Sequence, residues 1–463
     1  MKSISVFGTS SDAGKSTLTF VLAKLLQNRG YRTAAFKAQN VSNNARVADD
    51  GSEIAVAQYF QAEVLGIPTS YHLNPILLKS GKGEKASVIV NGKILDEQDV
   101  HAYYRNIDLL KPAVDAALEY LMERYDCVVC EGAGSPVELN LMDKDLSNLY
   151  VAERFRTKIV LVADIERGGV FASIWGVYNL LPEHLRPNVI GVIINKFRGD
   201  MSLFDEGVRI IEERFGIPVF GVLPYMSFNL GFEDSASLMH YTQTQPDAKI
   251  TLGVIAYPAM SNYNDIEPLI ADPEINVEFI RGNVPLEPYD LIILPGSKQT
   301  LNDLSWLKRN GLFERLQKRS QAVYGICGGY QMMFETLRDP HAVEASAPAQ
   351  ETGFGWIHGD IVFEPDKRLT RGRYTLFGES IEGFEMRHGI SQEGIDSYVS
   401  GNLCGSFVHG VFENDSFRTR YFKTLCPEYI GFDFPEHKRD VIETFVHECG
   451  KHLNVEEIIR HVV

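Results

Sequence analysis

The chain has 463 residues, 44% hydrophobic and 23% charged, a length that predicts two domains of about 200 residues each. The formal net charge of −16 and the pI near 5.3 argue against a nucleic-acid binder and against an anionic membrane surface. The six cysteines show no disulfide framework, the N-terminus shows no signal peptide, and no apolar run approaches the roughly 20 residues of a membrane helix. These features predict a cytoplasmic protein. A homo-oligomer is left open.

From residue 1 to about 235, short β-branched runs alternate with helical stretches, which is typical of a parallel α/β sheet. The predicted strands are Ile4–Phe7, Thr33–Phe36, Val128–Glu131, Ile159–Ala163, Val189–Asn195 and Val219–Leu223, and the predicted helices include Lys15–Gln27, Pro112–Arg124 and Asp205–Phe215. Cys127 and Cys130 stand three apart on one strand, so their side chains face opposite sides. We therefore predict neither a redox pair nor a metal site from this Cys-x-x-Cys.

A glycine-rich loop, Gly-Thr-Ser-Ser-Asp-Ala-Gly-Lys-Ser over residues 8–16, separates the first strand from the first helix. In such a unit the backbone N–H groups surround phosphate, a lysine adds positive charge and a hydroxyl ligates Mg²⁺. The usual spacing would place a glycine at Thr9, whereas this chain has Gly8 one position earlier. The strand and the helix on either side predict a nucleoside triphosphate site. The loop residues predicted to bind it are Thr9, Gly14, Lys15 and Ser16.

Other polar residues fall where such a site needs them. Glu131 ends a strand and opens a glycine-rich turn, which suits a carboxylate that binds Mg²⁺ together with Ser16. Asp50, in a loop, is a second candidate ligand. Asn195, at a strand end, is predicted to recognise the nucleotide base, and Lys37, after the second strand, to offset phosphate or substrate charge. Taken singly, the acidic residues could instead be solvated loop charges, and Asn195 a strand-terminating residue.

The polar residues 236–249 predict a linker, and a second α/β series follows over residues 250–463. Its predicted strands are Thr251–Ala256, Val277–Arg281, Leu291–Leu294 and Val323–Ile326. The segment 338–404, richer in glycine, proline and charge, is predicted to contain antiparallel strands.

The last of these parallel strands runs into the sequence Gly-Ile-Cys-Gly-Gly-Tyr-Gln, with the thiol at Cys327. A tight turn pushes this thiol out of the sheet, and the N-terminus of the following helix favours the thiolate, which is the nucleophilic form. The arrangement Gly-x-nucleophile-x-Gly is that of the nucleophile elbow in α/β-hydrolases. An isolated cysteine would more simply be a buried structural residue. The glycines and the glutamine in register instead predict Cys327 as a catalytic nucleophile.

The N-terminal half resembles the dethiobiotin-synthetase-like branch of the P-loop fold, whose loop is likewise Gly-Thr-x-x-x-x-Gly-Lys. The C-terminal half, with its Gly-x-Cys-x-Gly-x-Gln elbow, resembles a class I glutamine amidotransferase, which implies a flavodoxin-like domain. Their fusion in this order, with several further motifs along essentially the whole chain, resembles the cobyric acid synthase family of the cobalamin pathway. These motifs are Phe36–Asn40, Asn74–Lys79, Glu131–Pro136, Ala163–Gly169, Asn195–Asp200 and Leu294–Lys298.

The resemblance implies a reaction. Four peripheral carboxylates (b, d, e and g) of a corrinoid substrate, adenosylcobyrinic acid a,c-diamide, become carboxamides, each at the expense of one glutamine and one ATP with Mg²⁺. Lys37 and Asn40 then fall on the acyl-phosphate or substrate side. Two alternatives stay open: the related a,c-diamide synthase, which acts earlier on the corrin ring, and a P-loop ATPase switch that carries a non-catalytic amidotransferase-like module.

The resemblance also implies the rest of the amidotransferase site. His409, in an apolar run ending in His-Gly, would be the base, and Gly296 with the N–H of Gly328 would form the oxyanion hole. Many class I amidotransferases carry a glutamate two residues after this histidine, where this chain has Val411. The acid that orients His409 is therefore open, with Glu413 a candidate.

One motif departs from the family. The family usually reads Gly-Tyr-Glu-Ile-His-Met-Gly, whereas this chain has Arg387 at the histidine position and His388 one place later. If the segment lies near the glutamine site or between the domains, this departure would alter glutamine affinity or coupling.

Overall fold

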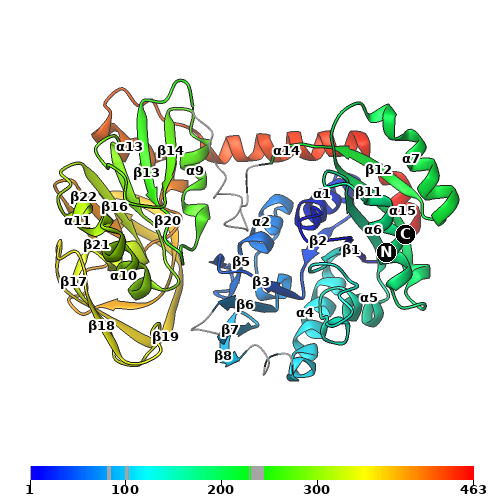
Figure 1. Cartoon of the computed structure of the whole chain (residues 1–463), viewed down its shortest axis with the longest axis horizontal. Coiled ribbons are helices and arrows are strands. Elements are labelled where there is room, and N and C mark those ends of the chain that lie inside the picture. The colour runs from blue at the N-terminus through cyan, green and yellow to red at the C-terminus, as the bar shows by residue number, and fades with distance from the viewer. Residues whose placement is uncertain are drawn as a thin grey trace.

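The computed structural model describes residues 2–80, 85–99, 103, 105–228, 230 and 245–462. Two α/β units lie side by side along the long axis of the molecule, and the helix α14 (Phe434–His452) spans the gap between them (Figure 1). Most of the predicted linker, residues 236–244, lies outside the described residues.

The first unit is built on six parallel strands in the order β12-β11-β10-β1-β9-β2. They are β1 (Ile4–Gly8), β2 (Thr33–Phe36), β9 (Cys127–Glu131), β10 (Lys158–Asp164), β11 (Val189–Phe197) and β12 (Val219–Pro224). All six predicted strands are confirmed. Strands β1 and β9 are buried along their whole length, as expected for a parallel sheet with helices on both faces.

Helices cover both faces of this sheet. The helices are α1 (Lys15–Gln27), α2 (Val56–Leu65), α4 (Lys111–Arg124), α5 (Leu149–Phe155), α6 (Val170–Leu180) and α7 (Asp205–Ile210). Apolar residues of α1 and α2 pack on one face, and those of α4, α5 and α6 pack on the other. The helix predicted over residues 205–215 begins as α7 and ends in a π-helical turn (Ile211–Phe215).

The last two helices, α14 and α15 (Val455–Val462), return to the first unit. Their apolar residues share a core with α1 and with one face of the first sheet. The N–H of Lys2 donates to the carbonyl of Val462, so the two ends of the chain lie together (Figure 1). The prediction that residues 250–463 form one domain is therefore wrong for these helices, because an amphipathic pattern does not reveal which core the helix covers.

The second unit holds the sheet β14-β13-β15-β16-β22-β21, in which five strands are parallel and β21 is an antiparallel edge. These strands are β13 (Ile250–Ile255), β14 (Ile275–Ile280), β15 (Leu291–Leu294), β16 (Ala322–Ile326), β21 (Ser397–Ser400) and β22 (Leu403–Ser406). The helices of this unit are α9 (Glu267–Ala271), α10 (Thr300–Asn310), α11 (Leu312–Gln317), α12 (Gly328–Gln331) and α13 (Asp415–Leu425). The two units together agree with the predicted fold class.

A second, four-stranded sheet of this unit contains the antiparallel strands predicted within residues 338–404. Its strands are β17 (Phe334–Asp339), β18 (Ala349–Thr352), β19 (Ile357–Leu376) and β20 (Glu379–Ser391), in the order β18-β17-β19-β20. The pairs β17–β18 and β19–β20 are antiparallel, whereas β17 and β19 are parallel.

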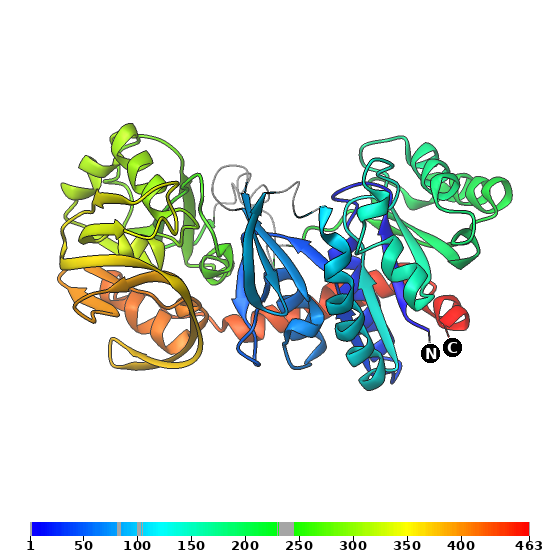
Figure 2. The same cartoon turned by 90° about the horizontal axis from the view of Figure 1, so that it is seen from below.

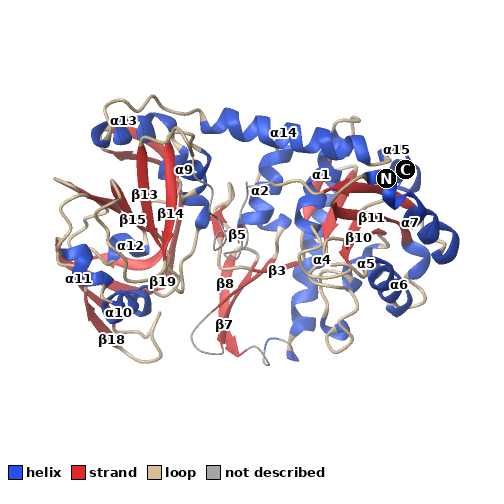
Figure 3. Cartoon of the chain, turned by 45° about the horizontal axis from the view of Figure 1, so that its top comes forward, coloured by secondary structure: helices blue, strands red, loops and turns tan. Residues whose placement is uncertain are grey.

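Two small sheets of the first unit lie between the main sheets (Figures 2 and 3). One contains β3 (Gln39–Val41), β6 (Ile76–Ser80), β7 (Lys85–Val90) and β8 (Lys93–Asp99), and the other pairs β4 (Ala45–Val47) with β5 (Glu53–Ala55). They face β19 and β20 of the second unit, so the boundary between the units is a packed interface. Along the described part of the chain, no helix is long and apolar enough to cross a membrane.

Candidate active sites of the two units

The glycine-rich loop between β1 and α1 is fixed by backbone and side-chain contacts. The N–H of Thr9 donates to the carbonyl of Val162 at 2.9 Å, which ties the loop to β10. Gly14 has φ 99°, and a Cβ there would lie 2.2 Å from Asn195 Nδ2, so only glycine fits. Asn195 Nδ2 in turn donates to the carbonyl of Ala13 at 2.9 Å. The loop thus opens onto the N-terminus of α1, where N–H groups without helical acceptors favour an anion.

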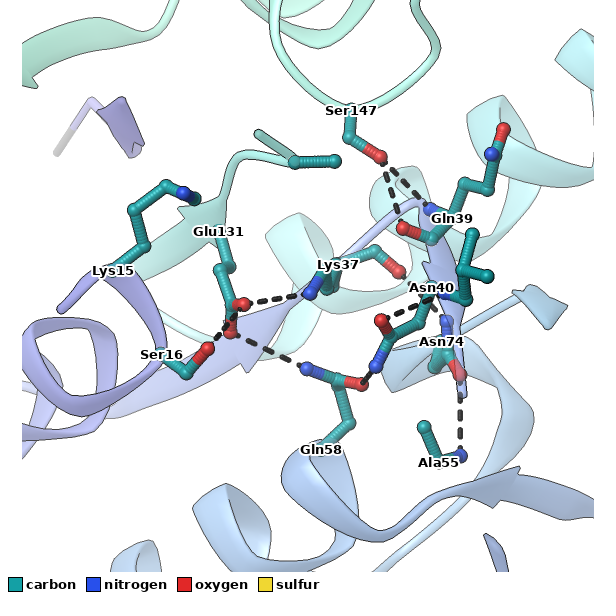
Figure 4. Close-up of polar contacts among 12 residues, drawn as sticks. Lys15, Ser16, Lys37, Gln39, Asn40, Ala55, Gln58, Asn74, Glu131 and Ser147 are labelled. Carbon is teal, nitrogen blue, oxygen red and sulfur yellow. Dashed lines mark hydrogen bonds and ion pairs between the residues drawn. The ribbon is translucent and has the colours of Figure 1, made fainter. Parts of the chain in front are cut away.

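Figure 4 shows Glu131 at the end of β9 as the centre of a polar cluster beside this loop. Its Oε1 accepts hydrogen bonds from Ser16 Oγ at 2.7 Å and from Lys37 Nζ at 2.8 Å. Its Oε2 accepts from Gln61 Nε2 at 2.7 Å. The structure therefore brings together three of the residues predicted from the sequence, Ser16, Lys37 and Glu131, and adds Gln61 from α2.

The charge of this cluster is set by burial and by Lys37. Burial alone would raise the pKa of Glu131, but the charge of Lys37 and the hydrogen bonds from Ser16 and Gln61 hold it below its usual value. Glu131 is thus a carboxylate at neutral pH, neutralised by an ammonium group. Lys15 Nζ, which donates to the carbonyl of Ser10 at 3.2 Å, provides a second positive charge next to the loop.

The oxygen atoms beside the loop suit a hydrated Mg²⁺ ion. The hydroxyl of Ser16 and the carboxylate of Glu131 are oxygen ligands, and Mg²⁺ at nucleotide sites takes its other ligands from phosphate and water. The structure does not bring Asp50 to this cluster. Its exposed carboxylate accepts from the N–H groups of Ser52 at 3.0 Å and Tyr71 at 3.3 Å, in the turn after β4. No group of three or more His, Cys, Asp or Glu that could hold a metal occurs among the described residues.

Asn40 joins the same network from β3. Its Nδ2 donates to Gln58 Oε1 at 2.9 Å, and Gln58 Nε2 donates to Glu131 Oε2 at 3.3 Å (Figure 4). Lys37 and Asn40, both predicted on the substrate side, are therefore linked to the carboxylate at the phosphate loop. Which substrate atoms they contact stays a prediction, as does the recognition of the base by Asn195.

Cys327 occupies a strained turn between β16 and α12. Its φ of 48° and ψ of −104° are unusual for a residue with a Cβ, and such strain concentrates at functional sites. The neighbouring glycines are required by close packing: a Cβ at Gly329 would lie 2.0 Å from the carbonyl oxygen of Leu294, and one at Gly328 would lie 2.7 Å from the nitrogen of Ser297. The turn has the form of a nucleophile elbow.

His409 follows β22 and is oriented by a residue that the sequence did not indicate. Its Nδ1–H donates to Asp265 Oδ2 at 2.6 Å, and Asp265 Oδ1 accepts the N–H of Gly410 at 2.8 Å. Asp265 lies in a short 3-10 turn (Tyr263–Asp265) that follows β13. Burial lowers the pKa of His409, but the charge of Asp265, which accepts the hydrogen bond from Nδ1, and the neighbouring Cys327 raise it to about 10. The three side chains form a buried Cys–His–Asp set.

Glu413, the acid suggested by the sequence, has a different partner. Its two carboxylate oxygens accept from Arg46 Nη1 at 2.8 Å and Nη2 at 3.0 Å, so it forms a bidentate pair with the other unit. Val411 is buried and cannot accept a hydrogen bond through its side chain. The suggestion that Glu413 orients His409 is therefore wrong, because the Glu413 carboxylate pairs with Arg46 and the Nδ1–H of His409 donates to Asp265.

The ends of β15 and β16 meet at this site. The N–H of Gly329 donates to the carbonyl of Pro295 at 3.0 Å, and a Cβ at Gly296 would lie only 3.1 Å from His409 Cε1. Gly328 is the first residue of α12, where a backbone N–H has no acceptor within the helix. The structure thus places Gly296 against the histidine and Gly328 next to the thiol, and their role as an oxyanion hole stays a prediction.

A cavity of about 350 Å³ opens in front of Cys327 and His409, and both units line it. The first unit contributes Lys79 and Ser87, and the second unit contributes Lys298, Thr300, Gln331, Glu344, Lys367 and others. Burial raises the pKa of Glu344 to about 8. The cavity is large enough for an amino acid, and one of its walls belongs to the interface between the units.

The unusual pair Arg387–His388 also lies at this cavity. The Arg387 side chain is fully buried, and it donates to Glu385 Oε2 and to the carbonyl of Gly389, each at 2.7 Å. His388 Nδ1 donates to the carbonyl of Glu364 at 2.9 Å, and burial together with the charge of Lys367 lowers its pKa to about 4. The substitution thus places a paired guanidinium and a neutral imidazole at the cavity wall.

Three charged residues lock the units together beside the cavity. Glu53 accepts from Lys79 at 2.9 Å and from Lys367 of β19 at 2.6 Å, with all three side chains buried. Although burial opposes it, the two lysine charges hold the pKa of Glu53 well below its usual range. Burial and the charge of Lys79 lower the pKa of Lys367 to about 7 despite Glu53. One carboxylate therefore accepts hydrogen bonds from two lysine side chains.

Replacing Glu53 with glutamine should lower the free energy of unfolding by about 3–5 kcal/mol at pH 7, because it leaves two buried lysines without a carboxylate. The pKa of Lys367 in the folded protein is about 7, so the loss should be largest just below pH 7, where Lys367 carries its proton, and should shrink as the pH rises through about 7 and Lys367 becomes neutral. Urea unfolding at several pH values measures this.

The matched control for Glu53 is Arg371→Gln, which removes an exposed ion pair with Asp49 across the same interface. It should cost about 1 kcal/mol or less. Equal effects of the two variants would show that the buried Glu53 contributes no more to the free energy of unfolding than an exposed ion pair does.

Two family models match the chain. The model of the CobQ/CobB/MinD/ParA nucleotide binding domain matches residues 4–229, and that of the CobB/CobQ-like glutamine amidotransferase domain matches residues 251–417. Fold and sites thus define a P-loop nucleotide-binding domain joined to a glutamine amidotransferase domain.

Similarity to whole proteins narrows this class. A cobyric acid synthase of Acinetobacter baylyi is 61% identical over 462 residues, covering 100% of this chain and 99% of that protein. One of Listeria monocytogenes is 38% identical over 473 residues, covering 95% and 92%. The chain belongs to the cobyric acid synthase family, as its sequence motifs predicted. Among solved structures, a glutamine amidotransferase aligns with 38% of this chain and 97% of its own at 18% identity and a TM-score of 0.30.

Proposed function

We propose that this chain uses ATP and glutamine to convert the b, d, e and g carboxylates of adenosylcobyrinic acid a,c-diamide into carboxamides. One observation carries the proposal: a single chain of this family holds a buried Ser16–Glu131–Lys37 cluster at a phosphate loop and a cysteine elbow facing a His–Asp pair. The first site suits activation of a carboxylate and the second suits release of ammonia. Amide formation needs both.

In the nucleotide domain, a substrate carboxylate attacks the γ-phosphorus of ATP, the bond from that phosphorus to the β–γ bridging oxygen breaks, and ADP leaves. The product is an acyl phosphate, whose phosphate is a far better leaving group than oxide. Loop N–H groups and Lys15 stabilise the charge on the transferred phosphoryl group. Ser16 and Glu131 would hold Mg²⁺, which supplies further neutralisation of phosphate charge. Lys37 and Asn40 orient the carboxylate.

In the amidotransferase domain, the Cys327 thiolate attacks the side-chain amide carbon of glutamine. The N–H groups of Gly296 and Gly328 bind the resulting oxyanion. His409 gives its proton to the leaving nitrogen, and ammonia departs as the thioester forms. His409 then takes a proton from water, which attacks the thioester and releases glutamate and the thiolate. Asp265 fixes the ring through Nδ1, so that Nε2 serves these transfers.

Ammonia then attacks the acyl phosphate, phosphate leaves and the amide forms. Free ammonia in solution is mostly protonated at neutral pH and is then not nucleophilic. Its release inside a protein from glutamine avoids that loss. The cavity wall shared by both domains supports a direct transfer between them.

Mass spectrometry of adenosylcobyrinic acid a,c-diamide incubated with the protein, Mg·ATP and glutamine tests the proposal. We expect four successive products, each differing by the exchange of a hydroxyl for an amino group. Amidation of cobyrinic acid at two positions would instead indicate the earlier a,c-diamide synthase. Hydrolysis of ATP without any release of glutamate would indicate an ATPase switch.

Asp265→Asn should lower glutaminase turnover by about 10²- to 10³-fold, because the ring loses the charge that orients it. The loss is smaller than the roughly 10⁴-fold seen in a serine triad, since a thiol ionises more readily than a hydroxyl. Removing Asp265 also removes the largest influence that raises the pKa of His409, so the alkaline limb of the pH–rate profile should move to lower pH. Glutamate release measured from pH 6 to pH 10 reports both effects.

Glu379→Gln is the matched control for Asp265→Asn. It removes a carboxylate of the same domain that pairs with Arg420 at the surface. Turnover and pH profile should stay at the wild-type level. An Asp265→Asn protein that keeps the wild-type alkaline limb would contradict the assigned His–Asp pair.

A further inference from the structure

A segment of the nucleotide domain reaches the catalytic histidine of the other domain. Asn44 precedes β4, and its Oδ1 accepts the N–H of Asn262 at 2.7 Å. The N–H of Ala45 donates back to Asn262 Oδ1 at 3.5 Å. Both asparagines are buried, with 3% and 4% exposure, so this reciprocal contact is shielded from water. It is a polar link between the start of β4 and the amidotransferase site.

Asn262 in turn touches the ring of His409. Its Nδ2 lies 3.2 Å from Nε2 and 3.4 Å from Nδ1. Such nearly equal distances place the amide over the face of the ring, because an in-plane position would overlap Cε1. Asn262 has φ 58°, a left-handed conformation that asparagine tolerates better than most residues. Asn44 therefore holds Asn262 in the conformation that covers the histidine.

Strand β4 also supports His409 through an aromatic ring of the amidotransferase domain. Phe384 of β20 stacks on His409 with a centroid distance of 5.1 Å and an interplanar angle of 20°. Phe384 belongs to an apolar cluster that crosses the interface, with Ala45 and Val47 from the nucleotide domain. The guanidinium of Arg46 lies 5.1 Å from the centre of the Phe384 ring.

Arg46 makes a second contact with the histidine segment. Its bidentate pair with Glu413 holds the 3-10 turn (Val411–Glu413) that begins two residues after His409. Arg46 is nearly buried, at 9% exposure, and a forked pair of this kind fixes geometry as well as charge. Strand β4 thus braces His409 through Asn262, through Phe384 and through the turn after it.

The other end of this segment lies at the phosphate loop. Lys37 contacts Glu131 directly, and Asn40 reaches the same carboxylate through Gln58 (Figure 4). Ten residues of continuous chain, from Lys37 to Arg46, therefore touch both candidate active sites. A short covalent segment of this kind places the two sites in a fixed relation when the domains are packed.

We propose that Asn44 and Arg46 are positioning residues of the glutaminase centre, supplied by the nucleotide domain, so that the Cys327–His409 pair is competent only when the domains are packed against each other. This inference rests on the proposed roles of Cys327 and His409. The consequence is that glutamine is hydrolysed only where an acceptor site for ammonia is adjacent.

The test uses the full-length chain and the variants Asn44→Ala and Arg46→Lys, the second of which keeps the charge but loses the fork and the flat guanidinium. Glutaminase kcat should fall by about tenfold to a hundredfold with little change in KM for glutamine, as for a misplaced catalytic group. Alkylation of Cys327 by iodoacetamide should slow in parallel. Amidation with added ammonia should keep most of its rate, because the phosphate-loop cluster is untouched.

Arg371→Gln serves as the control, because its ion pair with Asp49 crosses the same interface at the surface. It should leave glutaminase kcat unchanged. The inference is overturned if Asn44→Ala and Arg46→Lys behave like this control, or if they lose ammonia-dependent amidation equally. Cys327→Ala, run beside them, separates this failure from failure of the proposed function: if that protein still hydrolyses glutamine, the nucleophile itself is misassigned.

Discussion

Cys327→Ala should abolish glutamine-dependent amidation while amidation with ammonium salts continues. Without the thiolate no thioester can form, and loss of a catalytic nucleophile costs about five to six orders of magnitude in turnover. In the proposed mechanism the acyl phosphate forms in the other domain, at Lys15 and Glu131, so added ammonia can still attack it. Amide formation and glutamate release, measured side by side with each nitrogen source, give the result.

Cys404→Ala is the matched control for this variant. Cys404 lies on the adjacent strand β22 and is as buried as Cys327, at 6% exposure each. Its removal creates a comparable cavity but leaves the elbow intact, so both nitrogen sources should still work. If Cys327→Ala instead loses both activities, the cysteine supports the fold and is not the nucleophile.

The elbow could be predicted because its determinants are local. Gly325, Cys327 and Gly329 lie within five residues, and each glycine is required by a backbone or side chain that approaches closely. The glycine-rich sequence of the phosphate loop is local in the same sense, although the side chain that leaves room only for glycine at position 14, Asn195, comes from the distant strand β11. Strands of the parallel sheets could likewise be predicted, since both faces are buried and the apolar runs are continuous.

Asp265 could not be predicted because it lies 144 residues from His409, on a different strand end. The sequence around it reads as an ordinary polar loop, and only the parallel order β13-β15-β16-β22 brings that loop to the histidine. The sequence suggests Glu413 because it lies near His409 along the chain. Its partner, Arg46, comes from the other domain, and pairing across an interface leaves no local signal.

The C-terminal helices show a related limit. α14 has a clear amphipathic pattern, which predicts a helix with one buried face but not the core that it joins. Because it packs on α1, the chain crosses between the domains twice. The residues of the candidate glutaminase site therefore lie, along the sequence, between two crossings of the chain from one domain to the other, which favours the close domain packing on which Asn44 and Arg46 depend.

Lys15→Ala should produce the opposite result to Cys327→Ala: amidation should fall by about 10³-fold or more with either nitrogen source. A phosphate-loop lysine stabilises charge that develops during phosphoryl transfer, and removing such a group costs several kcal/mol of transition-state stabilisation. Glutaminase turnover should persist, because Lys15 belongs to the phosphate loop and not to the segment that braces His409. ADP formation and glutamate release, followed in the same reaction, separate the two sites.

Lys24→Ala is the control on the same helix. Lys24 Nζ donates to Gln27 one turn later, away from the loop, and its loss should leave ADP formation unchanged. If Lys15→Ala forms ADP at the wild-type rate in the presence of the corrinoid, the loop does not activate the carboxylate. If it instead silences glutamine hydrolysis as well, the phosphate site must act on His409 through the segment from Lys37 to Arg46, since that segment contacts both.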